Sequence, residues 1–404
     1  MTLVNIPILY KKEYECCGCG ACMNMCPVHA ITLLENDVGF LFPQIDDEKC
    51  TGCGLCKTAC AFQNIDEKNH PLSTYVAANQ NKEVSKFSAS GGVFAAIASA
   101  ILKENGIVFG VILDEKINPV HVGIDKNSDL RPMQGSKYVQ SYIGWTYSEV
   151  KKLLNEGKTV LFSGTPCQVA GLKGYLKKDY DNLLTIDIVC HGVPNSKFFK
   201  EYIASLEKRF DGKIVEFKFR DKSIGWGKNG RAIFEKNGRT YSKKIYASES
   251  PYYACFLDDI SFRESCYKCK YASDKRPADI TLGDFWGIEK EHPELLKNGT
   301  FREQDGISVV IANSEKGQQF LKSCKELKLV ETVFAKASNG NPQLRMATKM
   351  PEKYKELMKL YSEKGYAGIE SYINKRPFYK KYESRIKSFI PVSIKRFVKM
   401  KIAK

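Results

Sequence analysis

Residues 16–27 read CCGCGACMNMCP and residues 50–60 read CTGCGLCKTAC, and these two stretches decide the architecture. Each stretch separates three cysteines by gaps of two residues and adds a fourth cysteine after a gap of three. Such gaps let one tight loop present three thiolates to three corners of a cubane, while the fourth cysteine ligates a second cluster. Glycines between the cysteines suit a backbone that curls with positive φ. The spacing therefore predicts two 4Fe-4S clusters that exchange one ligand each.

The eight cysteines divide into two crossed sets. Structural zinc is the alternative, but a zinc site usually joins two separated CxxC pairs and leaves the repeated third and fourth cysteines unexplained. Cys17 falls outside the spacing and is interpreted as a buried thiol. The predicted sets are Cys16, Cys19, Cys22 and Cys60 for one cluster, and Cys50, Cys53, Cys56 and Cys26 for the other.

Composition places these motifs in a globular protein of a reducing compartment. The chain has 404 residues, of which 43% are hydrophobic, enough for a buried core and two or three domains. Nine of the fifteen cysteines fall in residues 16–60 at metal-ligand spacings, not in a disulfide pattern. The longest apolar run, 93–102, is too short to cross a bilayer, and the first residues do not resemble a signal peptide. We therefore expect a cytoplasmic protein.

The positive charge is concentrated at the C-terminal end. Net charge is +16, and residues 375–404 contain eleven Lys or Arg against the single acid Glu383. No nucleic-acid-binding module accompanies this charge, so we expect no nucleic-acid partner. Apolar residues recur on one face of the tail, which suits peripheral contact with an anionic membrane at its inner face. A solvated tail or a helix docked on a partner is an equal alternative. These apolar residues are Ile386, Phe389, Ile390, Ile394, Phe397 and Val398.

Beyond the cysteine motifs, strands and helices alternate. Helical spacing follows SGG at 90–92, and a capping box at Thr146 and Glu149 predicts another helix. Further strands are expected near residues 107–113, 159–163, 183–189, 280–287 and 307–313. Residues 213–246 read as strands with a type I′ hairpin turn at Asn237 and Gly238. The predicted class is α+β, with a ferredoxin-like 2x[4Fe-4S] module followed by an α/β body with a mixed sheet.

Four later cysteines leave two interpretations open. Cys266 and Cys269 form a CxxC pair, while Cys167 and Cys190 each follow a predicted strand. Strand ends in an open α/β sheet converge on one crevice, where four such residues meet. Spacing alone favours a third cluster and a set of buried thiols equally. Two others, Cys255 and Cys324, lack a partner pattern and are assigned to the core.

Together these pieces resemble the coenzyme F420 hydrogenase/dehydrogenase beta-subunit family, whose members are flavin and iron-sulfur electron-transfer proteins. The resemblance runs through SASGGVFAAIA at 88–98, GSKYVQS at 135–141, SGTPCQVAGLK at 163–173, VCHGVP at 189–194, ESCYKCKYA at 264–272 and ADITLGDFWG at 278–287. With the basic tail, which lies outside the resemblance, we expect four units. They are a 2x[4Fe-4S] ferredoxin domain at 1–66, the N-terminal and C-terminal beta-subunit domains at 74–156 and 157–345, and a helical basic tail at 346–404.

The resemblance further implies FAD in the body and a third 4Fe-4S cluster on Cys167, Cys190, Cys266 and Cys269. The FAD pyrophosphate needs amide donors and positive charge. A helix start at Ser90, Gly91 and Gly92 offers amides, while Gly135 permits close approach and Lys137 adds charge. The residues alone favour a plainer interpretation, in which Ser90 caps a helix and Lys137 is solvated.

Other polar residues give no clear assignment. Gly225, Gly227 and Gly230 spell GxGxxG, but strands flank them and no helix follows, so we expect no dinucleotide site there. His191 is either a proton shuttle or a structural residue. Asp284 and Trp286 either line the flavin pocket or end a strand. We name no catalytic residue.

These expectations combine into one function. The chain is expected to be an iron-sulfur flavoprotein oxidoreductase that passes electrons between a low-potential one-electron carrier and a two-electron organic substrate. Clusters pass single electrons, whereas a flavin handles one or two, so FAD is the natural junction. Its expected partners are a ferredoxin or another redox protein and a small molecule. In the family that molecule is a deazaflavin or another organic compound, in some members within surface-polysaccharide biosynthesis. The alternative is a non-catalytic subunit that delivers electrons to a partner enzyme.

Overall fold

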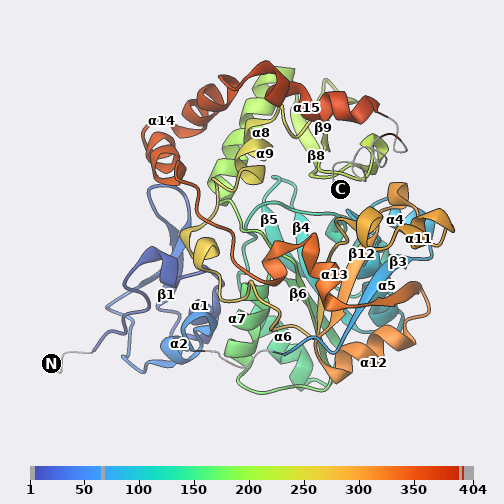
Figure 1. Ribbon diagram of the computed structural model, residues 1–404. Coiled ribbons are helices and arrows are strands. Elements are labelled where there is room, and N and C mark those ends of the chain that lie inside the picture. The colour runs from blue at the N-terminus through green and yellow to red at the C-terminus, as the bar shows by residue number, and fades with distance from the viewer. Residues whose placement is uncertain (1–4, 65–68, 391–393, 395–404) are drawn as a thin grey trace.

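The computed structural model describes residues 5–64, 69–390 and 394. A small N-terminal module lies beside a body built on an eight-stranded mixed sheet (Figure 1). Helices and a three-stranded sheet form a further layer, drawn at the top of the figure. The α+β class predicted from the sequence is confirmed.

The module consists of short elements between the cysteine loops. They are η1 (Glu13–Glu15), α1 (Ala21–Met25), β1 (Ile31–Glu35), β2 (Leu41–Ile45), α2 (Leu55–Thr58) and α3 (Ala61–Asn64). Gly20 and Gly54 precede α1 and α2 with φ of 75° and 73°. This left-handed conformation, which glycine adopts without steric cost, turns each cysteine loop into a helix. The strands β1 and β2 form an antiparallel hairpin.

One sheet organises the body. In spatial order its strands are β13 (Leu327–Thr332), β3 (Ser73–Asn79), β12 (Ser308–Ala312), β11 (Ile280–Asp284), β7 (Leu183–Ile188), β6 (Val160–Gly164), β4 (Ile107–Leu113) and β5 (Pro119–Ile124). The central strands β4, β6, β7 and β11 are parallel, and the outer strands pair antiparallel. The loops after parallel strands converge on one edge. Because β3 pairs with β12 and β4 with β6, the two predicted body units share this sheet.

Helices cover both faces of the sheet. They are α4 (Lys82–Ser85), α5 (Val93–Lys103), η2 (Asn127–Met133), α6 (Thr146–Asn155), α7 (Pro166–Leu176), α10 (Ile288–Glu291), α11 (Pro293–Lys297), η5 (Glu303–Asp305), α12 (Glu315–Ser323), α13 (Phe334–Asn339) and η6 (Pro342–Leu344). Successive strand residues point to opposite faces. Thus Leu161 packs with α5, whereas Phe162 packs with α6 and α7. The predicted helix at Thr146 is present, but its capping box does not form, because Trp145 is the N-cap.

The remaining layer, which we call the cap, packs around aromatic side chains. It contains α8 (Ser196–Phe210), β8 (Lys213–Lys218), η3 (Lys222–Ile224), β9 (Gly230–Lys236), β10 (Arg239–Ile245), α9 (Pro251–Leu257), α14 (Tyr354–Asn374) and α15 (Phe378–Phe389). Between the cap and the sheet lies η4 (Glu264–Lys268). Asn237 and Gly238 have φ of 52° and 70°, which confirms the type I′ turn. Among the described residues, no helix combines the length and apolarity needed to cross a bilayer.

The module is fixed to the body by buried polar contacts. Asn24 Nδ2 donates to the carbonyl of Gly144 at 2.8 Å, and Tyr271 Oη donates to that of Ala61 at 3.0 Å. Apolar side chains of α1 and α3 also share one core with α6 and α7. The cysteine loops are therefore held against the body, close to the start of α7.

Candidate functional site

The four cysteines predicted for the first cluster line one small cavity in the module, and we call them the inner group. The chain around α1 supplies Cys16, Cys19 and Cys22, and Cys60 comes from the short link between α2 and α3. Burial raises the pKa of Cys22 and that of Cys60, the latter to about 11, and negative charge on Cys19 and Cys16 raises both further. Buried thiolates that repel one another are stabilised by bound iron, so this donor set fits a 4Fe-4S cluster.

The second predicted set, the outer group, lies nearer the surface. Burial raises the pKa of Cys56, and negative charge on Cys53 and Cys26 adds to the rise. Cys26 of the first motif therefore lies with cysteines of the second motif, as a crossed ligation requires. Cys53 is exposed, and Cys50 and Cys26 are half-buried.

The structure also brings together Cys167, Cys190, Cys266 and Cys269, which we call the body group. Cys167 lies in the first turn of α7, Cys190 follows β7, and the other two belong to and follow η4. Burial raises the pKa of Cys190 to about 12, with further contributions from Cys167 and Cys269. Burial also raises the pKa of Cys266, and negative charge on each of the other three adds to it. All four thus face one another at the carboxyl edge of the sheet.

Zinc ions and iron-sulfur clusters place different demands on such thiols. Within the described part of the chain, no three His, Cys, Asp or Glu side chains lie close enough to share one metal ion. A zinc ion would draw its sulfur ligands to about 2.3 Å from one centre. A cubane instead holds each of its four thiolates on a separate iron.

Cys17 connects the inner and body groups. Hydrogen bonds to Cys167 and Cys19 raise the pKa of Cys17 well above its usual value. The same contacts lower the pKa of Cys19, and that of Cys167 to about 7. Cys17 thus lies between a ligand of the inner group and a ligand of the body group. Gly171 of α7 also lies close to Cys19, since a Cβ added to this glycine would stand 3.0 Å from Cys19 Sγ. The thiol predicted to be buried is buried, but its place between two ligand groups has no signal in the spacing.

A cavity of about 290 Å³, the ring cavity, opens at the carboxyl ends of the parallel strands. Each of the parallel strands β4, β6, β7 and β11 contributes to its lining, with Gly110, Ser163, Ile188 and Gly283 respectively. Cys167 of the body group also lies in its wall. A ligand in this cavity is therefore adjacent to a cysteine of the body group.

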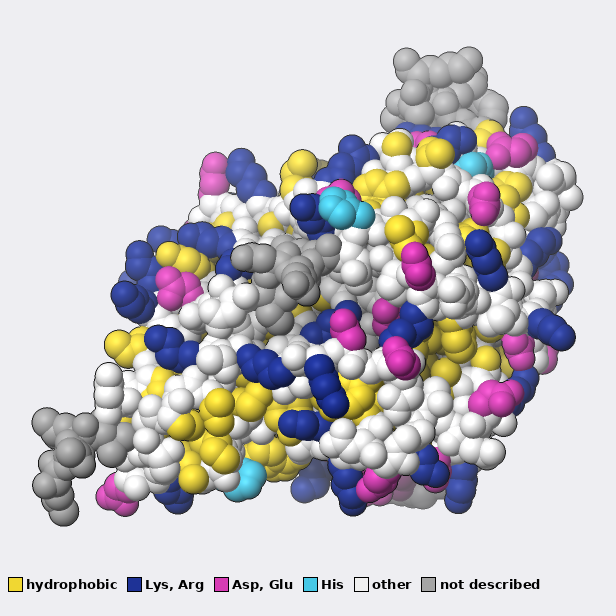
Figure 2. Space-filling view, turned by 90° about the horizontal axis from the view of Figure 1, so that it is seen from below, with side chains coloured by type: hydrophobic (Ala, Val, Ile, Leu, Met, Phe, Trp, Pro, Cys, Tyr) yellow, Lys and Arg dark blue, Asp and Glu magenta, His cyan; other side chains and the backbone are white. Residues whose placement is uncertain are grey.

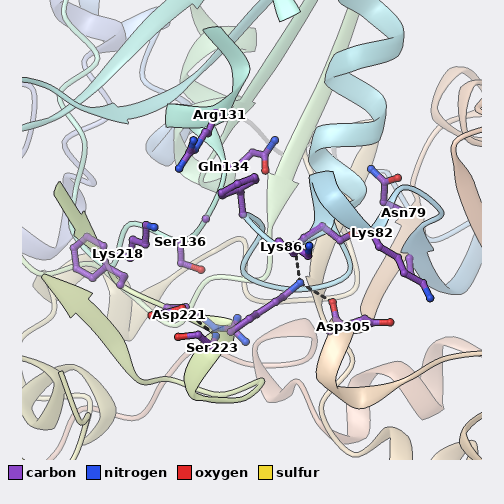
Figure 3. A pocket seen from close by; sticks show the side chains of 18 of the residues that line it. Asn79, Lys82, Lys86, Arg131, Gln134, Ser136, Lys218, Asp221, Ser223 and Asp305 are labelled. Atoms are coloured by element: carbon purple, nitrogen blue, oxygen red, sulfur yellow. Dashed lines mark hydrogen bonds between the residues drawn. The ribbon is translucent and has the colours of Figure 1, made fainter. Parts of the chain in front are cut away.

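A larger cavity of about 1050 Å³, the basic cavity, adjoins the first. The two share Gln134, Gly135, Ser136, Lys137 and Arg220. Nine Lys or Arg residues line the basic cavity against four Asp or Glu. Figure 3 shows several of them, among them Lys82, Lys86, Arg131 and Lys218, placed around its rim. Such a lining suits a ligand that carries phosphate.

Comparison with known families agrees with this geometry. Residues 157–337 match the family model for the C terminus of the beta subunit of coenzyme F420 hydrogenase/dehydrogenase, and residues 15–64 match that of a 4Fe-4S dicluster domain. Residues 157–337 are therefore similar to the C-terminal domain of this beta subunit. A dicluster domain followed by a domain of this kind supports a role in iron-sulfur electron transfer. All four body-group cysteines lie within the beta-subunit domain.

Other comparisons are more distant. No curated protein matches the chain significantly. One solved structure, titled "Xenon derivatization of the F420-reducing [NiFe] hydrogenase complex from Methanosarcina barkeri", matches with 14% identity and a TM-score of 0.42. The match covers 78% of this chain and 95% of that chain.

The helix start predicted to bind FAD lies ahead of the matched beta-subunit domain, at the wall of the ring cavity. Ser90 and Gly92 line this cavity. Ser90 Oγ donates to the carbonyl of Ile307 at 2.8 Å, and the Gly91 amide donates to Ser308 Oγ at 3.0 Å. These two donors are therefore engaged within the protein. The amides of the first turn of α5 are the remaining donors, since the first four N–H groups of a helix lack intrahelical partners.

Lys137 lies in the wall of both cavities, but its ammonium binds backbone. Its Nζ donates to the carbonyls of Pro132, Met133 and Gln134 at 2.8, 3.0 and 3.0 Å. Burial lowers the pKa of Lys137 to about 7. Lys137 therefore holds the end of η2 in place, and this segment forms part of the wall of both cavities. Any charge that Lys137 offers a ligand comes in addition to this role.

The sequence did not single out Arg220 and Trp226, which both contact Asp284 in the wall of the ring cavity. Arg220 Nη1 donates to Asp284 Oδ2 at 2.6 Å, and Trp226 Nε1 donates to Oδ1 at 2.9 Å. Trp226 stacks on Trp286 with ring centroids 5.1 Å apart. β11 ends at Asp284, and both Asp284 and Trp286 line the ring cavity, so a place beside a flavin stays a prediction for them. The loop of the GxGxxG sequence contributes Trp226, a role that the glycine pattern does not indicate.

His191 also lines the ring cavity. Burial lowers its pKa to about 4, helped by the positive charge of Lys228. The imidazole is therefore neutral at physiological pH and has one N–H donor and one acceptor nitrogen.

Proposed function

We propose that the chain passes electrons between a low-potential one-electron carrier and a two-electron organic substrate through three 4Fe-4S clusters and FAD. The observation that carries this proposal is the position of Cys167. It belongs to the body group and also lies in the wall of the ring cavity. A flavin ring bound there would be adjacent to a cluster ligand. The substrate is a small organic molecule, for which a deazaflavin and an intermediate of surface-polysaccharide biosynthesis both fit the family resemblance.

The order of the three groups supports a relay. The outer group has the exposed Cys53, and the inner group follows it within the module. Cys17 then bridges Cys19 of the inner group and Cys167 of the body group. Electrons would therefore cross from the surface to the ring cavity through neighbouring groups. FAD, when bound, supplies the exchange between one-electron and two-electron chemistry.

The adjacency of the two cavities and the positive charge of the larger one support FAD as the ligand. The ring cavity accepts the flavin ring, and the basic cavity accepts the diphosphate. Arg220 lines both, and its Nη2 is buried without a hydrogen-bond partner. An unsatisfied buried N–H costs free energy unless a ligand accepts from it. Arg220 would thus bind an acceptor of the cofactor, and the walls would keep water from the ring.

A third cavity of about 1230 Å³ favours an enzyme over a bare electron-delivery subunit. It lies between the loop at 224–229 and the C-terminal helices, and it shares Lys228 and Trp286 with the ring cavity. A substrate entering through this cavity would meet the ring cavity at these two residues. Turnover of a small molecule by the isolated chain supports the enzyme, and electron transfer only to a partner protein supports the delivery subunit.

The proposal is tested by counting cofactors in anaerobically purified protein. We expect about twelve iron atoms in three cubanes and one FAD per chain. Replacing Cys266 and Cys269 by Ser should remove about a third of the iron and leave both module signals in electron paramagnetic resonance. The control is Cys255→Ser, a buried thiol in the cap core that should leave the iron unchanged.

Two results would contradict parts of this proposal. About eight iron atoms in fully reconstituted wild type would remove the third cluster but spare the module. Absence of flavin from protein with full iron would remove FAD and leave a bare iron-sulfur carrier. Loss of all cluster signals in the double variant would indicate unfolding, which circular dichroism distinguishes.

A further inference from the structure

Arg263 is a buried cation at the contact between module and body. Its side chain is 1% exposed, and it lies just before η4. Nε donates to the carbonyl of Cys16 at 2.8 Å, and Nη2 donates to that of Leu41 at 2.7 Å. Nη1 reaches Gln140 Oε1 at 3.4 Å, and the guanidinium lies 4.1 Å from the centre of the Phe42 ring. All of these partners are neutral.

No carboxylate pairs with Arg263 among the residues that the structure describes. The contrast is Arg276, which is equally buried but forms an ion pair with Asp187 at 2.9 Å. Burying an ion without a counter-charge is costly, so an unpaired buried guanidinium indicates an anion that belongs beside it.

The anionic groups nearest Arg263 are cluster ligands. Its Nη2 lies 3.9 Å from Cys16 Sγ of the inner group. Burial raises the pKa of Cys16, and the charge of Arg263 opposes that rise. Arg263 also adjoins the body group, because the backbone amide of Cys266 donates to the Arg263 carbonyl at 2.9 Å. The same cation thus acts on both groups.

We propose that Arg263 is the shared counter-cation of the inner and body clusters and holds both reduction potentials above that of the outer cluster. The part concerning the body cluster rests on the third cluster of the proposed function. Reduction adds negative charge to a cluster, so a nearby cation stabilises the reduced form, and it does so most strongly where water is excluded. The outer cluster lies at an exposed edge, where solvent screens charge. Electrons that enter at the outer cluster therefore move toward higher reduction potential as they pass to the inner and body clusters.

The test is a redox titration of the holoprotein monitored by electron paramagnetic resonance. In Arg263→Gln, the equilibrium constant for reduction of the inner and body clusters should fall at least tenfold, which is about 59 mV for one electron. The outer cluster should keep its potential. Arg263→Lys retains the charge and should lie much closer to wild type. The matched control is Lys268→Met, which removes an exposed cation between two body ligands and should shift potentials little.

Each outcome decides the proposal. Unchanged inner and body potentials in Arg263→Gln would overturn it, and so would an equal shift of all three clusters. Arg263→Gln could fail to assemble clusters. In that case, an Arg263→Lys variant that assembles them at near wild-type potentials supports the role of the positive charge. If neither variant assembles clusters, Arg263 has a purely structural role. Wild type with only eight iron atoms would contradict the third cluster, yet the shift of the inner cluster would still test Arg263.

Discussion

At the residue scale, three glycines of the candidate flavin site have different surroundings. A Cβ on Gly91 would stand 2.6 Å from the carbonyl oxygen of Ala77 in β3, and one on Gly92 would stand 2.9 Å from Ser85 Oγ. Larger residues at positions 91 and 92 would disturb the edge of the sheet itself. Loss of flavin from such variants would therefore not identify a direct contact with the cofactor. Gly135 differs, because a Cβ there meets only the Phe87 carbonyl at 3.7 Å.

Gly135→Val is therefore the sharper probe of FAD binding. Gly135 has φ of +80° and lines both joined cavities, so valine should intrude on the cofactor. We expect substoichiometric flavin, with iron content unchanged. The strained backbone alone costs about 1 to 2 kcal/mol. Gly157→Val controls for this strain, because Gly157 has φ of +78° with no atom within 4 Å of its Cβ position. Equal flavin in both variants would contradict the assignment.

At the element scale, α15 carries the described part of the basic tail. One side of α15 contacts the rest of the cap. There Ser384 Oγ lies 2.7 Å from Ser248 Oγ, and Arg385 Nε donates to Glu249 at 2.6 Å. Its outer side exposes apolar residues, with Ile386 53% and Phe389 77% exposed. Phe397 and Val398, expected to extend this face, lie outside the described residues. One docked side and one apolar exposed side are compatible with either a membrane or a protein partner.

Truncation before Arg376 tests the membrane alternative. If the tail binds anionic lipid, the full chain should sediment with anionic vesicles, and high salt should weaken but not abolish binding, because apolar burial does not depend on charge screening. The truncated chain should remain in solution with iron, flavin and cluster reduction unchanged, since the cysteine groups and the ring and basic cavities lie on earlier elements. Full-length protein that ignores anionic vesicles at low salt would contradict membrane binding and favour a protein partner.

At the scale of the whole molecule, the outer group marks one end of the relay. Apolar side chains are exposed beside it, with Val28 two residues after Cys26 and Leu55 between Cys53 and Cys56. Figure 2 shows hydrophobic side chains gathered on the side of the molecule that carries the N-terminal module. An exposed apolar surface next to the least buried cysteines suits transient contact with a one-electron carrier protein.

Leu55→Glu should therefore slow electron entry from a carrier protein. We expect a several-fold lower rate of cluster reduction by reduced ferredoxin, with reduction by dithionite unchanged, because the small reductant needs no docking surface. Leu34→Glu is the matched control, since Leu34 is an exposed apolar residue of the same module on the β1–β2 hairpin. Equal slowing in both variants, or none in Leu55→Glu, would place the entry point elsewhere.

The sequence by itself determined the features that depend on local spacing. Gaps of two residues between cysteines predict cluster loops, because ligand geometry fixes how many residues separate adjacent thiolates. The hairpin at Asn237 and Gly238 was predictable for a similar reason, since a type I′ turn needs two residues that tolerate positive φ. The α+β class followed from alternating helical and strand periods, which need no knowledge of distant contacts.

Only the tertiary structure decided what these local pieces do together. Cys17 and Arg263 lie 246 positions apart in the chain, yet both reach the inner and body groups. Arg220 reaches Asp284 from another element. Such contacts form because the module packs on α6 and α7 and parallel strands end at one edge, and neither packing nor topology leaves a periodic signal in the sequence. Charge and burial act through space, so the unpaired cation and the bridging thiol appear only when the chain is folded.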